Sequence, residues 1–244
     1  MSHPFTIQLL RTEPHNCSYL PELIATTEFV SPEQKVDLSL YQALNDANFR
    51  RSGQHFYRPN CDKCDSCKPL RIQTNAFKPS KSNKRIQKKN AHLRIKLKTQ
   101  PDPDLYFLLY ERYILERHQG GDMYPPSREQ FDNFICAGAD SSHFIEFWDH
   151  SDDAANPKEN LIMVAVCDFL PLGLSAIYSF FEPTKSHLSL GTQAILTQIE
   201  IAKKMKLPYL YLGYWIKESS KMNYKSRFQP SEILENGEWQ PLPF

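Results

Sequence analysis

Three cysteines recur at three-residue intervals in the first third of the chain, at Cys61, Cys64 and Cys67. Thiolates at this spacing can reach one ion, and a tetrahedral zinc ion or a four-iron cluster needs four ligands. Cys17 is the natural fourth ligand because it lies outside any apolar run, and His55 is the substitute. The spacing therefore predicts a zinc or iron–sulfur site, and the alternative is a set of reduced thiols that bind no metal.

The cysteines lie within the most basic part of the chain. Residues 50–98 contain 15 Lys or Arg and two acidic residues, whereas the whole chain has 29 basic and 28 acidic residues. A segment polarised in this way is suited to a polyanion, because phosphates provide sequence-independent affinity. Tyr57 and Phe77 could stack a base. The alternative is a solvated charged face. We expect nucleic-acid contacts from the basic run of Lys78, Lys81, Lys84, Arg85, Lys88 and Lys89.

Aromatic residues gather in two stretches of the second half, YSFFEP at residues 178–183 and YLYLGYW at residues 209–215. If both stretches are strands, alternation places half of the side chains in the core. The other half could line a cleft. The candidates to face a ligand are Tyr178, Glu182, Tyr211 and Trp215, and simple core packing is the alternative at each position.

The elements that must position these residues are clearest in the second half. Two apolar runs at residues 161–168 and 174–181 flank a turn containing Pro and Gly, which is typical of a β-hairpin. A helix is expected at residues 192–205 and a further strand at residues 209–215. Strands around a helix in one mixed sheet indicate an α+β fold.

The first 100 residues carry weaker signals. The segment SPEQ at residues 31–34 is typical of a helix start, with Ser as N-cap and Pro at the first helical position. Residues 92–98 alternate between polar and apolar, which predicts a half-buried strand. We expect a boundary near residue 100, between a cysteine-rich, basic domain at residues 1–100 and a second domain at residues 101–244.

Composition excludes several classes of protein. The chain has 244 residues, 41% of them hydrophobic, and a mean hydropathy of −0.53, as in soluble globular proteins. The longest apolar run, at residues 161–167, is too short to span a bilayer. The first residues lack the basic start, apolar stretch and cleavage site of a signal peptide. We therefore expect a cytoplasmic protein with no membrane partner, in which cysteines stay reduced.

Five segments read together resemble the bacterial aspartate/glutamate leucyltransferases, relatives of the arginyl-tRNA–protein transferases. The match runs in order from Cys17 to Phe228. The segments are FRRSGQHFYRPNC, FKPSKSNKRIQKKN, LSAIYSFFEP, SLGTQAI and PYLYLGYWIKESSKMNYKSRF.

The resemblance implies a GNAT-like acyltransferase domain in the second half. It implies transfer of leucine from leucyl-tRNA to proteins with N-terminal Asp or Glu, which marks them for degradation, and no DNA partner. The resemblance also implies that the transfer step requires no cofactor. Cysteines of eukaryotic relatives are linked to iron–sulfur binding, and Cys17, Cys61, Cys64 and Cys67 fall in the matching region. The chain lacks the glycine-rich loop that holds CoA in GNAT enzymes; the turn at Ser189-Leu-Gly191 takes its place.

This reaction needs positioning more than acid–base power. An aminoacyl ester is already activated, and a free α-amino group has a pKa of about 7.7–8.0. Holding amine and ester together supplies most of the acceleration, and donors to the oxyanion come second. An acidic acceptor side chain calls for arginine. We assign acceptor binding to Arg50, Arg51 and Arg58, catalysis to Tyr178 and Glu182, and the pocket to Tyr211 and Trp215.

Three alternatives remain at this point. An arginyl-tRNA donor would need a buried acid in the pocket, and Glu182 is the only acid near the aromatic stretches, so leucine is preferred. A non-catalytic, metal-stabilised RNA-binding module would account for residues 50–98 but has no use for the second half. A CoA-dependent acetyltransferase is disfavoured by the missing pyrophosphate loop.

Overall fold

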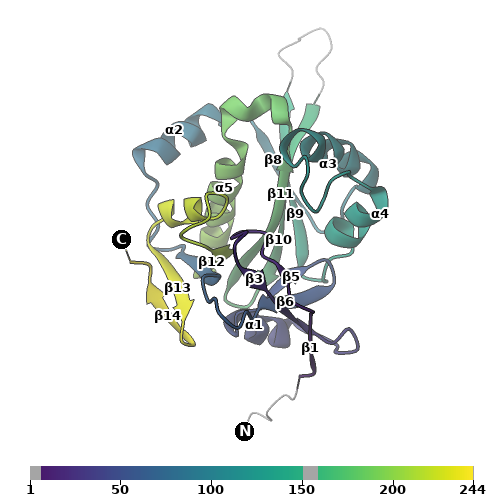
Figure 1. The fold of residues 1–244 in the computed structure, drawn as a ribbon. Helices are drawn as coiled ribbons and strands as arrows, with labels where there is room; N and C mark the ends of the chain where they lie inside the picture. The colour runs from purple at the N-terminus through teal and green to yellow at the C-terminus, as the bar shows by residue number, and fades with distance from the viewer. Residues whose placement is uncertain (1–6, 151–158, 244) are drawn as a thin grey trace.

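An eight-stranded mixed sheet forms the centre of the fold (Figure 1). The computed structural model describes residues 7–150 and 159–243. In spatial order the strands are β14 (Glu238–Pro241), β13 (Ser231–Glu235), β7 (Lys68–Gln73), β12 (Tyr209–Trp215), β11 (Gly173–Phe181), β10 (Glu159–Leu170), β9 (Ser142–His150) and β8 (Arg94–Lys98). Neighbouring strands are antiparallel except for one parallel pair, β11 with β12.

Strands from before residue 100 belong to this sheet. β7 lies between β12 and β13 and pairs with both, and β8 forms the far edge beside β9. The first and second parts of the chain therefore share one sheet, and the expected boundary near residue 100 does not coincide with a break in it.

Helices cover both faces of the large sheet. Along β10, Met163, Ala165 and Cys167 pack into the cluster that contains residues of α5, whereas Val164 and Val166 pack into the cluster of α3. This alternation places the two helices on opposite faces. The helices are α1 (Leu38–Asp46), α2 (Lys81–Lys89), α3 (Pro103–Arg117), α4 (Arg128–Phe131) and α5 (Leu190–Lys204), with a π-helical turn η1 (Asp132–Cys136) and 3₁₀ turns η2 (Pro183–Leu188) and η3 (Asn223–Arg227).

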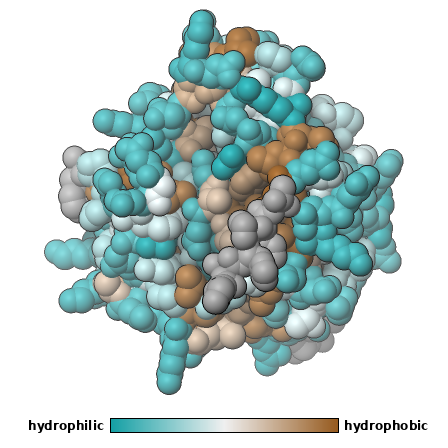
Figure 2. Space-filling view, turned by 90° about the horizontal axis from the view of Figure 1, so that it is seen from below, coloured by the Kyte–Doolittle hydropathy of each residue, from teal (hydrophilic) through white to brown (hydrophobic). Residues whose placement is uncertain are grey.

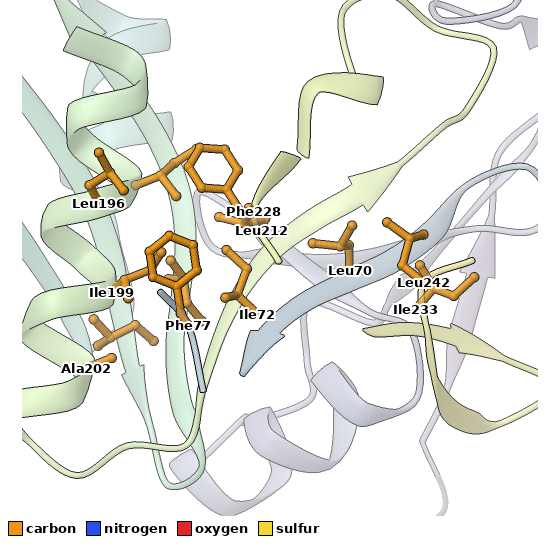
Figure 3. Packing of buried hydrophobic residues seen from close by; sticks show 13 residues of the cluster. Leu70, Ile72, Phe77, Leu196, Ile199, Ala202, Leu212, Phe228, Ile233 and Leu242 are labelled. Atoms are coloured by element: carbon orange, nitrogen blue, oxygen red, sulfur yellow. The ribbon is translucent and has the colours of Figure 1, made fainter. Parts of the chain in front are cut away.

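The cluster under α5 brings together residues 70–77, residues 174–212 and residues 228–242. Figure 3 shows Leu196 and Ile199 of α5 beside Ile72 of β7, with Phe77 and Phe228 next to them. All of these side chains are buried. Because truncating such a side chain to alanine costs about 2–5 kcal/mol, this cluster fixes β7 firmly in the sheet.

A smaller, four-stranded sheet packs against one end of the large one. Its strands, in spatial order, are β1 (Leu9–Arg11), β4 (Thr27–Val30), β6 (His55–Pro59) and β5 (Arg50–Ser52); β2 (His15–Asn16) and β3 (Ile24–Ala25) form a separate pair. Gly53, in the turn between β5 and β6, has a φ of +58° and lies so close to the carbonyl of Asn133 that a Cβ would clash. That turn therefore requires glycine.

Several expectations about the elements are confirmed. The α+β class holds, the hairpin is β10 with β11, the helix is α5, and the last strand is β12 with the expected bounds. The helix expected from Ser31 is wrong, because residues 31–37 form a turn and coil; α1 follows at Leu38, after its N-cap Asp37, whose carboxylate accepts from the amide of Leu40. The prediction that β8 is half-buried is also wrong, because this edge strand leaves Ile95 and Leu97 exposed.

Apolar side chains are concentrated in part of the lower surface. Figure 2 shows this face from below, with hydrophilic residues around most of its margin and brown, apolar residues gathered within it. Among residues 7–150 and 159–243, no helix is long and apolar enough to cross a bilayer.

Candidate active site

Arg50 of β5 is a buried guanidinium with one unfilled edge. Its Nη1 donates to the carbonyl oxygens of Asn45 and Phe49 at 3.0 and 2.6 Å. Its Nε and Nη2 are buried and have no hydrogen-bond partner among the described residues. The guanidinium carbon lies 5.6 Å from the centre of the Tyr214 ring on β12. Since buried donors are normally satisfied, this edge is a candidate site for a ligand oxygen.

Arg51, the next residue, shows what such an edge binds. Its Nε and Nη2 donate to the two carboxylate oxygens of Asp168 on β10, at 2.6 and 2.8 Å. Ser142 and Tyr41 donate to the same carboxylate, at 2.7 and 2.6 Å. Arg51 and Asp168 are both buried. This network joins β5 of the small sheet to β9 and β10, so Arg51 is engaged in holding the two sheets together.

Arg58, the third arginine assigned to the acceptor, is also paired. Its Nε donates to the carboxylate of Glu28 at 2.8 Å, across the β4–β6 pair. Of the three arginines, Arg50 is the one with buried donors that have no partner in the described part of the chain.

Lys225 of η3 approaches the same place. It is 6% exposed, and its Nζ donates to the carbonyl of Tyr214 at 2.5 Å. Burial and the charge of Arg50 lower the pKa of Lys225 to about 7, and burial lowers the pKa of Arg50 as well. Two buried basic side chains thus flank Tyr214 at the end of β12.

The four cysteines line one cavity of about 450 Å³. Cys61 and Cys64 face each other across an isolated antiparallel bridge, and all four are free thiols. Burial, with the neighbouring cysteines, raises the pKa of Cys67 to about 12. His55, the substitute ligand, is not among the lining residues.

The donor set fits a thiophilic metal in kind, since four thiols share one cavity. The four thiols are not arranged as ligands in this structure. Within residues 7–150 and 159–243, no three His, Cys, Asp or Glu side chains are arranged to hold a metal ion. The zinc or iron–sulfur site therefore stays a prediction.

The large sheet opens between β11 and β12. Pairing between them ends after three residues, at Ser175 with Tyr211, while β11 stays paired with β10 and β12 with β7. Tyr178 and Trp215 both lie beyond the last paired residues. The Tyr178 hydroxyl contacts the sulfur of Met123 at 3.5 Å, and burial raises the pKa of Tyr178, so this hydroxyl keeps its proton.

The Trp215 indole nitrogen is buried and has no partner in the described part of the chain. Tyr211, by contrast, is fully buried in the core cluster that contains α1, where its hydroxyl accepts from Gln42 at 3.3 Å. Tyr211 therefore packs in the core between the large sheet on one side and the small sheet with α1 on the other.

Glu182 forms the cap of η2. Its carboxylate pairs with Arg112 at 3.0 Å and accepts from the Thr184 hydroxyl at 2.9 Å. Burial works to raise the pKa of Glu182, but these hydrogen bonds and the charge of Arg112 outweigh burial and lower it. The carboxylate is therefore ionised and engaged, and these contacts are those of a structural cap.

The basic run forms one exposed face of α2. Lys81, Lys84, Arg85 and Lys88 lie three or four residues apart and are all exposed, as are Lys78 and Lys89. The C-terminal end of α2 is anchored beside the start of α5: Lys89 donates to the carbonyl of His187 and Asn90 to that of Leu188, both at 2.9 Å.

Two residues of this region were not assigned from the sequence. Asp168 ends the longest apolar run of the chain, and an acid within such a run signals a buried, paired charge. Lys225 lies in the basic, aromatic segment 221–228, where nothing in the local pattern distinguishes a buried lysine from its exposed neighbours.

Comparison with protein families and known proteins agrees with the sequence resemblance. Residues 15–85 match the N terminus, and residues 106–235 the C terminus, of arginine-tRNA-protein transferase. A Marinobacter nauticus protein named aspartate/glutamate leucyltransferase is 50% identical over 242 residues, 99% of each chain. A protein of the same name from Pseudomonas savastanoi pv. phaseolicola is 47% identical over 236 residues, 97% of each chain.

Among solved structures, the crystal structure of FemX aligns with a TM-score of 0.46 and 8% identity, covering 85% of this chain and 79% of that one. The chain belongs to the arginine-tRNA-protein transferase family.

Proposed function

We propose that this aminoacyltransferase moves leucine from leucyl-tRNA to the α-amino group of proteins with N-terminal Asp or Glu. The observation that carries the proposal is the full-length similarity to proteins named aspartate/glutamate leucyltransferase, at 50% identity over 99% of both chains. The unfilled edge of Arg50 supports the acidic acceptor, because the same edge of Arg51 binds a carboxylate.

The reaction is an aminolysis of an ester. The neutral α-amine attacks the leucyl carbonyl, the bond to the tRNA ribose oxygen breaks, and the amine proton leaves with that oxygen or to water. The amine has a pKa of about 7.7–8.0, so a strong general base is not needed. We place the reacting groups where β11 and β12 separate, in a GNAT-like arrangement, so that the enzyme acts chiefly by positioning.

Tyr178 is the donor that we assign to the developing oxyanion. Its hydroxyl keeps its proton because burial raises the pKa of Tyr178. Tyr178→Phe should lower kcat for leucine transfer by about 10²-fold, the usual effect of losing one oxyanion donor. Steady-state transfer to an N-terminal Asp peptide measures this change. Tyr124→Phe, at an exposed tyrosine, is the matched control. An unchanged kcat in Tyr178→Phe would remove this tyrosine from the mechanism.

The exposed face of α2 is our proposed contact for the tRNA backbone. It carries cations that form no ion pair within the described residues, and it lies beside the start of α5. The double substitution Lys84→Ala and Lys88→Ala should weaken tRNA binding and reduce the slope of log K against log salt by about two, one for each lost phosphate contact.

Filter binding or anisotropy over a range of salt concentrations tests this assignment. Lys35→Ala, at an exposed lysine of the segment before α1, is the control and should leave the slope unchanged. The assignment would fail if the double variant kept the wild-type slope.

The cysteine cavity is our proposed metal site, with Cys17, Cys61, Cys64 and Cys67 as ligands for zinc or an iron–sulfur cluster. Such a group would cross-link the loops that carry the cysteines. Protein purified without oxygen should contain zinc, or iron with acid-labile sulfide, at one site per chain by elemental analysis. Cys64→Ser should lower that content, whereas Cys136→Ser, outside the cavity, should not. Metal-free wild-type protein prepared in this way would contradict the site.

Two donors and two acceptors test the proposed function. Purified protein is incubated with radiolabelled leucyl-tRNA or arginyl-tRNA and with a peptide that begins with Asp or with Lys. We expect label only from leucyl-tRNA and only on the Asp peptide. Arginine transfer would replace the donor and keep the reaction. Salt-dependent tRNA binding without any transfer would favour the RNA-binding module instead.

A further inference from the structure

Lys225 and Arg50 come from opposite ends of the chain and meet at the end of β12. The Lys225 ammonium donates to the backbone carbonyl of Tyr214 and lies 3.8 Å from where a Cβ on Gly213 would be. Arg50 lies 5.6 Å from the ring centre of the same tyrosine. Burial, and after it the charge of Arg50, lowers the pKa of Lys225 to about 7. The two basic side chains therefore share one small, buried region.

No described residue neutralises this pair. Arg50 is 5% and Lys225 6% exposed, and neither forms an ion pair among residues 7–150 and 159–243. The tyrosines around Arg50 do not supply an anion, since burial raises the pKa of Tyr57 to about 12 and that of Tyr214 as well. Two like charges held out of water without a counter-charge are costly, which is why the pKa of Lys225 is lowered, and a bound anion would favour its protonated form again.

Unsatisfied polar atoms mark the same region. The Nε and Nη2 atoms of Arg50 lack partners, and so do both side-chain amide atoms of Asn45, whose backbone carbonyl accepts from Arg50. Asn45 is 1% exposed. The open donors of Arg50 and of the Asn45 amide suit an oxygen-rich anion of small size. A carboxylate matches the edge of Arg50, as the Arg51–Asp168 pair demonstrates in the same molecule.

We propose that Lys225 and Arg50 form a two-cation site for the side-chain carboxylate of the acceptor's N-terminal Asp or Glu, with Lys225 as a specificity-determining residue. This inference rests on the proposed function. Arg50 receives the carboxylate through two parallel hydrogen bonds, and Lys225 supplies the second positive charge. An N-terminal Asn or Gln keeps the shape of the acceptor but not its charge, so it leaves both cations uncompensated.

The test compares Lys225→Met, Lys225→Arg and the wild type on peptides that begin with Asp or with Asn. We expect Lys225→Met to lower kcat/KM for the Asp peptide at least tenfold, through the KM for peptide, and to shrink the preference for Asp over Asn. The KM for leucyl-tRNA should not change. Lys225→Arg should restore most of the preference, which a purely structural loss would not allow. Thermal unfolding of each variant identifies one that fails to fold.

The outcomes separate this inference from the proposed function. A folded Lys225→Met variant with the wild-type Asp-over-Asn preference would overturn the inference and leave the function intact. If the wild type transfers no leucine, the proposed function fails, and equilibrium binding of the Asp peptide, followed by anisotropy, still decides the role of Lys225. Binding that weakens at least tenfold in Lys225→Met supports the two-cation site, and equal binding contradicts it.

Discussion

Arg50→Met should reduce kcat/KM for leucine transfer to an N-terminal Asp peptide by at least about 25-fold. Among residues 7–150 and 159–243, the substitution removes the one buried guanidinium edge whose donors are free to bind a carboxylate. Loss of one partner from a buried, hydrogen-bonded charge pair costs about 2–5 kcal/mol, and 1.4 kcal/mol corresponds to a factor of ten. Steady-state transfer assays with saturating leucyl-tRNA measure the change.

The matched control for Arg50→Met is Arg128→Met. Arg128 is exposed on α4 and is already paired with Asp104 and Asp132, so its loss should leave kcat/KM within a factor of two or so. Binding of leucyl-tRNA should be unchanged in both variants. An Arg50→Met variant that transfers leucine to the Asp peptide at the wild-type rate would exclude Arg50 from acceptor binding.

Asp168→Ala should destabilise the protein by about 3–5 kcal/mol, because it leaves Arg51 buried without its counter-charge. Arg51 and Asp168 have side-chain exposures of 1% and 0%. The same substitution removes the acceptor of the Ser142 and Tyr41 hydroxyls, and with it the polar contact that Arg51 makes between the small sheet and the large one. Urea unfolding followed by circular dichroism measures the loss.

Two further variants test whether the loss of stability in Asp168→Ala comes from the unpaired, buried charge of Arg51. Arg51→Met combined with Asp168→Leu should recover much of the lost stability, since apolar replacement of a complete buried pair is often neutral. Asp62→Ala, which breaks the exposed Arg11–Asp62 pair, should change the free energy of unfolding little. If Asp168→Ala proved as mild as Asp62→Ala, the network would not hold the two sheets together.

The elements that depend on local pattern could be predicted from the sequence. The β10–β11 hairpin, α5 and β12 follow from apolar periodicity and a turn, and each was found close to its expected bounds. The helix expected at Ser31 failed because a capping signature is only a local preference. The chain turns at residues 31–37, and Asp37 supplies the cap in its place.

Long-range pairing could not be predicted. The position of β7 between β12 and β13 joins residues about 140–160 apart in the sequence, and no local signal specifies such partners. The prediction for β8 failed for a similar reason. The alternation of polar and apolar residues in β8 is the same whether the strand lies at the edge or in the centre of the sheet, so it does not tell whether the apolar face is covered.

The candidate site illustrates the same limit at single residues. Arg50 and Arg51 are adjacent and identical in type, so the sequence alone assigns them one role. In the fold they point to different surroundings: Asp168, 117 positions away, fills the edge of Arg51, while the edge of Arg50 stays open. Burial of Lys225 beside Arg50 likewise depends on where η3 packs against β12.

The central claim is that this enzyme reads the negative charge of the acceptor's first side chain. The most direct measurement compares wild-type leucine transfer to two peptides that differ only in an N-terminal Asp or Asn. A preference for Asp of at least 100-fold in kcat/KM is the result that a buried cationic site predicts. Equal rates on the two peptides would show that the charge is not read, and would contradict the account.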